Sequence, residues 1–246
     1  MGVNKLLRSY SVAALFLALG LAGCGGGPEA TSDVTTVHPD DGRDRNHSAN
    51  DGVQIEGLLG TLSREEIQLG LEPRLGRFES CFVRAATANE IVSGRVEFFF
   101  RIATDGRVRR VYPRASSVGD RETERCLLGV AQSARFHQPH GGEAEFTWPI
   151  EYPVSDDVRP PVNWEADRVG SVVASRGGEA LQACGAGGVS LQVTAYVAPG
   201  GRVITAGAST PNAEALDHVD CIVDAVRSWS LPDPGSYPAK VTFDLR

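Results

Sequence analysis

This sequence has no excess of basic residues. Its 246 residues include 24 Lys and Arg against 31 Asp and Glu, a formal net charge of -7 at pH 7. Residues 1–23 contain Lys5 and Arg8 and no acid, so the rest of the chain carries 22 basic and 31 acidic residues, a net charge of -9. Binding to nucleic acid or to anionic lipid headgroups needs a basic surface. The composition therefore argues against both as direct partners.

Sequence motifs of common enzyme classes are also missing. The chain contains no Gly-x-Ser-x-Gly nucleophile turn, no phosphate-binding loop and no dinucleotide-binding glycine pattern. We therefore expect no enzymatic activity and no cofactor. At 41% hydrophobic and 22% charged residues, the chain still has enough apolar material to form a core.

Histidine is scarce, and two groups of residues deserve a test as metal ligands. His137 and His140 precede Glu143 and Glu145 in a loop rich in Pro and Gly. A second group lies in a polar segment and consists of His38, Asp40, Asp41, Asp44, His47 and Asp51. A metal site needs ligands held in place by their surroundings, and neither a loop nor a polar segment provides this. We expect both groups to be solvated and assign no metal ligands.

The N-terminus has the three parts of an export signal. Lys5 and Arg8 precede an apolar run of 10 residues, 12–21, which is half the roughly 20 that a membrane-spanning helix needs. Leu21-Ala22-Gly23-Cys24 follows and resembles the lipobox of bacterial lipoproteins. The resemblance implies cleavage before Cys24 and a lipid on its thiol. Gly25, with no Asp directly after the cysteine, implies sorting to the outer membrane, facing the periplasm.

Two polar segments divide the remainder. We expect a signal peptide at 1–23, a flexible tether at 24–58 that is poor in large apolar residues, and a shorter linker at 155–165. The segments between and after them, 59–154 and 166–246, align with each other at a constant offset of 95. Identical pairs include Gly106 with Gly201 and Cys126 with Cys221. We infer two copies of one structural unit.

Each unit has the pattern helix, hairpin, helix, strand. In the first unit, Ser63 and Glu66 have capping-box spacing, and Pro73 predicts a kink or a new helix start. We expect strands at 95–102, 108–113 and 143–152, joined by a turn at Gly106, and a helix at 120–135.

In the second unit we expect helices at 166–183 and 213–229, and strands at 189–197, 202–209 and 239–245. The predicted fold class is α+β: two tandem small domains, each a three-stranded antiparallel sheet with two helices on one face.

The order of short motifs in the first unit is similar to a known family. Cys81-Phe82, Asp105-Gly106-Arg107-Val108 and Arg125-Cys126-Leu127 occur in the order seen in the C-terminal domain of AgmX/PglI-type gliding-motility proteins. More distantly they resemble the TonB C-terminal domain. The second unit keeps Cys184 and Cys221 but has Gly185 where the aromatic residue would follow. The resemblance implies a periplasmic module that binds another cell-envelope protein.

Four cysteines remain after Cys24, and an exported chain matures in an oxidising compartment. Four cysteines allow three pairings, and the repeat selects one of them. We predict disulfides Cys81–Cys126 and Cys184–Cys221, because each unit holds one cysteine at the end of its first helix and one in its second. The alternative is four buried free thiols.

The sequence pattern also indicates the environment of two charged pairs on a predicted helix and of Phe99. Glu122 and Glu124 alternate with Arg121 and Arg125, which indicates a solvated helix face. Phe99 must point away from Phe98 and Phe100 in an extended strand. It either lies beneath the contact between the two units or belongs to a surface that binds a partner.

Three functional hypotheses follow. The first is a lipid-tethered adaptor that binds another envelope protein, for instance by strand addition to a free sheet edge. The second is a structural protein of envelope assembly whose units space or dimerise components. The third is a metal-dependent hydrolase built around His137 and His140.

Overall fold

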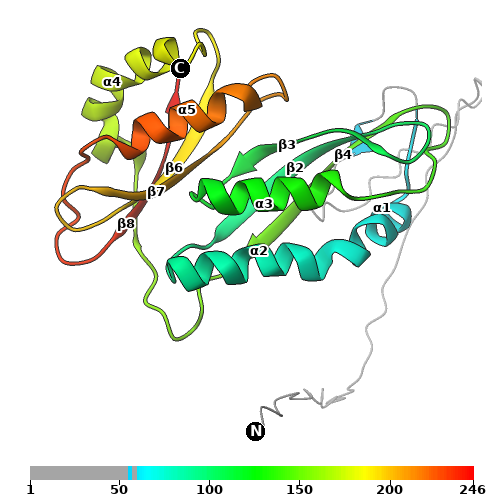
Figure 1. The fold of residues 1–246 in the computed structure, drawn as a ribbon, viewed down its shortest axis with the longest axis horizontal. Helices are drawn as coiled ribbons and strands as arrows, with labels where there is room; N and C mark the ends of the chain where they lie inside the picture. Colours follow the sequence, from blue (N-terminus) through cyan, green and yellow to red (C-terminus); the bar gives the residue numbers. More distant parts are fainter. Residues whose placement is uncertain (1–54, 57–59) are drawn as a thin grey trace, which may run out of the picture. The chain divides into compact units, whose positions relative to one another are not determined.

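The computed structural model describes residues 55–56 and 60–246, and Figure 1 shows their fold. The described chain is α+β, with two four-stranded sheets whose strand orders are β1-β4-β2-β3 and β5-β8-β6-β7. All the described residues fall within one compact unit, so both sheets belong to the same body. The predicted signal peptide, Cys24 and most of the predicted tether lie outside the described residues.

The first sheet is antiparallel throughout. Its long strands are β2 (Gly94–Ile102), β3 (Val108–Ser116) and β4 (Ala144–Tyr152), and the two-residue β1 (Ile55–Glu56) pairs with β4. The β2 side chains alternate as the sequence predicts, with Val96, Phe98, Phe100 and Ile102 buried. Pro149 lies in the part of β4 beyond its pairing with β1, where its missing N–H leaves no ladder bond unmade.

Three helices cover the buried face of this sheet: α1 (Arg64–Leu71), α2 (Leu75–Ala88) and α3 (Arg121–Gln132). Ser63 and Glu66 form the predicted capping box at the start of α1. The short 3₁₀ turn η1 (Glu72–Arg74) contains Pro73 and separates α1 from α2, so the helix is interrupted where proline cannot continue it. Phe78 and Phe82 of α2 and Leu127 of α3 pack with the β2 side chains in one core.

The second sheet repeats this arrangement with smaller side chains. Its strands are β6 (Leu191–Val197), β7 (Val203–Ser209) and β8 (Ala239–Leu245), and its helices are α4 (Gly170–Ala183) and α5 (Leu216–Arg227). The 3₁₀ turn η2 (Ala166–Val169) leads into α4. Apolar residues of β6, β8, α4 and α5 form a second core.

The offset of 95 in the sequence recurs in the backbone. Gly106 and Gly201 have φ values of 78° and 80°. Each accepts a hydrogen bond at its carbonyl, from the N–H of Phe136 and of Leu231 respectively, both at 2.9 Å. A Cβ on either glycine would lie 2.2 or 2.1 Å from the carbonyl oxygen of that same partner. Glycine is therefore required at both positions, by its conformation and by the close approach of the backbone.

The predicted three-stranded sheets need a correction, because each sheet has a fourth, short strand. In the second sheet this is β5 (Val162–Trp164), which pairs in parallel with β8 and makes that sheet mixed. β5 lies within the segment 155–165 that the sequence indicates as a linker. A three-residue strand preceded by two prolines has no detectable alternation, so its pairing depends on the neighbouring β8.

Candidate functional site

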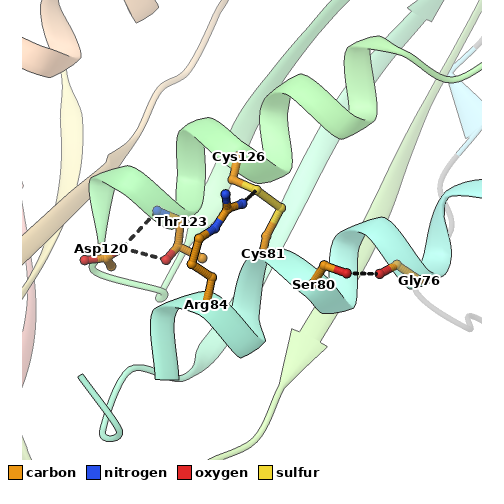
Figure 2. The surroundings of a disulfide bond; sticks show 7 residues. All are labelled: Gly76, Ser80, Cys81, Arg84, Asp120, Thr123 and Cys126. Atoms are coloured by element: carbon orange, nitrogen blue, oxygen red, sulfur yellow. Dashed lines mark hydrogen bonds between the residues drawn. A yellow bond between two sulfur atoms is a disulfide. The ribbon is translucent and has the colours of Figure 1, made fainter. Parts of the chain in front are cut away.

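The structure contains two disulfides, and they join the cysteines that the repeat selects. Cys81 is bonded to Cys126 across 45 residues and Cys184 to Cys221 across 37, with Cα–Cα distances of 5.8 and 5.6 Å. The first bond ties α2 to α3, as Figure 2 shows. The two disulfides hold the helix pair of each repeat together.

The two disulfides differ in their surroundings. Cys81 is only 2% exposed, and the guanidinium of Arg84 donates a hydrogen bond to the sulfur of Cys126 at 2.6 Å (Figure 2). In the second repeat Cys221 is exposed at the surface of α5. The second disulfide is therefore the one more open to solvent.

His137 and His140 are both exposed in the loop between α3 and β4. His140 pairs its backbone with Thr61, and its ring lies 3.5 Å from a carboxylate oxygen of Glu66. Hydrogen bonds from Ser63, first from its backbone N–H and then from its hydroxyl, lower the pKa of Glu66. Within the part of the chain that the structure describes, His, Cys, Asp and Glu side chains nowhere gather in a group of three or more suited to a metal ion.

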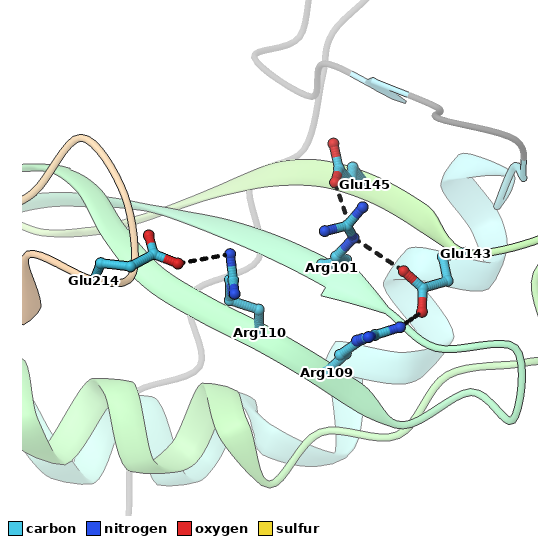
Figure 3. A network of polar contacts seen from close by, with 6 residues as sticks. All are labelled: Arg101, Arg109, Arg110, Glu143, Glu145 and Glu214. Atoms are coloured by element: carbon cyan, nitrogen blue, oxygen red, sulfur yellow. Dashed lines mark hydrogen bonds and ion pairs between the residues drawn. The ribbon is translucent and has the colours of Figure 1, made fainter.

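The face of the first sheet opposite its helices carries a network of charged residues (Figure 3). The Nε atom of Arg101 lies 3.0 Å from Glu143 and 3.1 Å from Glu145, and Arg109 also pairs with Glu143. Phe99 lies on this same face and stacks on Tyr112 with ring centroids 4.9 Å apart. Both rings belong to the first sheet.

Exposed apolar side chains concentrate on α1 and α2. Among the described residues, four large hydrophobic side chains are exposed, and three of them are Leu69 (54%), Leu75 (51%) and Val83 (51%). Leu75 and Val83 are eight residues apart on α2 and thus lie on one face of the helix. A shallow depression on the same helix is lined by Glu79, Ser80, Val83, Arg84, Thr87 and Ala88.

The two repeats contact each other through buried residues. Tyr196 of β6 is fully buried and packs with the core of the first repeat. Its hydroxyl accepts a hydrogen bond from the N–H of Ser93 at 3.0 Å and donates one to the Ser93 carbonyl at 2.9 Å. Lys240 of β8 also donates to this carbonyl, at 2.8 Å, and burial lowers the pKa of its ammonium group to about 8. Phe99 takes no part in these hydrogen bonds.

Glu124 of α3 also lies in this contact, and the expectation of a solvated helix face is wrong for it. Its side chain is 1% exposed, while Glu122 is exposed as expected. The carboxylate accepts a hydrogen bond from the hydroxyl of Ser116 at 2.7 Å and from the N–H of Ala208 at 3.0 Å. Burial raises its pKa to about 7, against the effect of these two hydrogen bonds and of Arg121.

The repeat contained a sign of this buried acid. At the offset of 95, Glu124 corresponds to Val219, which is fully buried in the second core. An acid at a position whose counterpart is apolar indicates a buried or special environment. The spacing of charged residues along α3 indicated a solvated face instead. Charge spacing alone does not show which residues of the other repeat pack against the helix.

Comparison with protein-family models, with curated proteins and with solved structures finds no match for this chain. Over residues 55–56 and 60–246, no helix is both long and apolar enough to cross a membrane.

Proposed function

We propose that this chain is a non-catalytic, lipid-anchored protein-binding module of the bacterial cell envelope, with the exposed face of α2 as its contact surface. The observation that carries the surface assignment is the pair Leu75 and Val83, which are both half exposed on one face of a helix. Apolar residues grouped on an exposed face favour contact with another protein.

Two features of the chain support an envelope location. The basic residues, the apolar run and Cys24 have the order of a lipoprotein signal. Two disulfides in a chain of this size fit an oxidising compartment outside the cytoplasm. The partner in this proposal is another envelope protein, and the membrane is reached through the lipid on Cys24, at the periplasmic face of the outer membrane.

Binding by a helix face is the mode we favour over strand addition. The outer edges of β3 and β7 are partly occupied, since Thr210, just after β7, donates to the carbonyl of Pro113 in β3 at 2.9 Å. The Ala208 N–H on the same edge of β7 is bound by Glu124. These contacts leave less room for an added strand. By contrast, Leu75 and Val83 each keep about half of their surface exposed among the described residues.

Co-purification tests this proposal. The double variant Leu75→Glu and Val83→Glu keeps the core intact and places two charges on the α2 face. The matched control, Ser171→Glu and Gln182→Glu, adds the same two charges to exposed positions of α4. We expect one envelope protein to co-purify with the wild type and the control and to be lost from the α2 variant. Equal recovery with both variants would refute the α2 surface.

The same experiment separates the other hypotheses. A protein that only spaces or dimerises components would co-purify with copies of itself, and the α2 variant would change its oligomeric state. A hydrolase built around His137 and His140 would require bound metal in the purified chain.

A further inference from the structure

The contact between α3 and β7 is built around one carboxylate. Glu124 accepts hydrogen bonds from Ser116, at the end of β3, and from Ala208, near the end of β7. A single side chain from the first repeat is thus bonded to a strand of each sheet. Ala208 pairs with Val193 on the other side of β7, so Glu124 occupies the place that a further strand would take.

The space around the carboxylate is shaped for it. A Cβ on Gly207 would lie 2.4 Å from one carboxylate oxygen, so the carboxylate occupies its present place because residue 207 of β7 has no side chain. Ser116 also accepts a hydrogen bond from the N–H of Val118 at 3.2 Å. The Ser116 hydroxyl oxygen keeps a second lone pair, which can accept a hydrogen bond from the protonated carboxyl group of Glu124. The protonated acid can therefore donate to Ser116 while the N–H bonds of Val118 and Ala208 are kept, provided that the Ser116 hydroxyl hydrogen turns away from the carboxyl group.

The surroundings stabilise the deprotonated, charged form of Glu124 less well. Both direct donors to the carboxylate are neutral, and a buried charge without a direct ionic partner is costly. The charged and titratable groups facing it are Asp120, which caps α3, Arg121 in the first turn of α3, and Tyr196 on β6. Arg121 is engaged with Asp220 of α5, at 2.5 Å from its Nε atom, and Asp120 binds Thr205 of β7 at 2.7 Å.

We propose that Glu124 makes the contact between the two repeats proton-sensitive: uptake of one solvent proton by its carboxylate tightens the contact of α3 with β7, and loss of that proton loosens it. The step forms one O–H bond on Glu124, which then donates to Ser116. The Ser116 hydroxyl hydrogen turns away from the carboxyl group, and the other carboxyl oxygen still accepts from Ala208. This inference stands independently of the proposed function.

The direction with pH follows from the pKa values. In the closed contact the pKa of Glu124 is about 7, and in the open state it returns to its ordinary value of 4.5. The proton-linked tightening is complete below pH 4.5 and is lost as pH rises to 7. Asp220 and Glu66 have lowered pKa values and titrate below this window, while Lys240, with a pKa of about 8, titrates above it.

Amide hydrogen exchange in the full chain tests the proposal. The reporters are the amides of Ala208 and Thr210, whose hydrogen bonds cross the contact. We expect their protection factors to fall by about tenfold for each pH unit from pH 5 to pH 7, and to level off above pH 7. Glu124→Gln keeps an acceptor for Ala208 and a donor for Ser116 but cannot titrate, and its protection factors should not change with pH.

Protection factors that fall with pH equally in the wild type and in Glu124→Gln would overturn the proposal, as would protection in the wild type that does not change with pH. A direct measurement covers the case in which Glu124→Gln does not fold. Carbon-13 NMR of the Glu124 carboxyl in the wild-type chain should report a midpoint near pH 7, and a midpoint near pH 4.5 would overturn the proposal.

Discussion

Removing the two disulfides one at a time should separate their contributions to stability. The first variant is Cys81→Ala with Cys126→Ala, and the second is Cys184→Ala with Cys221→Ala. The disulfides close spans of 45 and 37 residues. On the chain-entropy model, each removal lowers the free energy of unfolding by about 4 kcal/mol, because both spans are of similar length.

The two variants should lose unequal amounts of unfolding free energy, because the cysteines differ in burial. Cys81 is 2% exposed and packs in the first core with Phe78 and Phe82, so its truncation also removes buried contacts, at about 1 kcal/mol more. Cys221 is exposed and leaves no cavity. Since proteins of this size have about 5–15 kcal/mol of stability in all, the first variant should be close to unfolding at 37 °C.

Urea unfolding of both variants and the wild type measures these losses. Selective reduction gives an independent comparison: at low reductant concentration, alkylation and mass spectrometry should find Cys184 and Cys221 labelled before Cys81 and Cys126. A loss below about 1 kcal/mol in both variants, or first reduction of the Cys81–Cys126 bond, would refute this reasoning.

Three further predictions concern single positions. Gly201→Ala should lower the free energy of unfolding by at least about 2 kcal/mol in urea, through its positive φ and its close backbone neighbour, while Gly187→Ala, in open space, should have little effect. Lys240 has its pKa lowered to about 8, so wild-type stability in urea should rise by up to about 3 kcal/mol from pH 8 to pH 10.5, and Lys240→Met should remove this rise. Cys24→Ser should move the protein from the membrane fraction to the soluble fraction on cell fractionation; soluble wild-type protein would contradict the lipid anchor.

The repeat allowed much of the fold to be predicted from the sequence. Because the two copies share one register, a turn at Gly106 implied a turn at Gly201, and the cysteine positions implied one disulfide in each copy. The last strand, 239–245, has the predicted bounds because buried residues alternate with more exposed ones along its whole length.

What the sequence did not predict depends on contacts between distant segments. The short strands β1 and β5 are ordered by the edges of β4 and β8, and their own residues have no strand pattern. Glu124 is buried by Ser116 and by β7, which lies more than 80 residues away in the chain. The spacing of charges on α3 depends on the helix sequence alone. It therefore cannot predict that β7 packs against Glu124.

Site-specific photo-crosslinking in cells tests the central claim most directly. A crosslinking residue is placed at Leu75 or Val83 on α2, and at Ser171 or Gln182 on α4 as the control. We expect both α2 positions to crosslink to the same envelope protein and neither α4 position to do so. Crosslinks to that protein from α4 alone, or from all four positions equally, would contradict it.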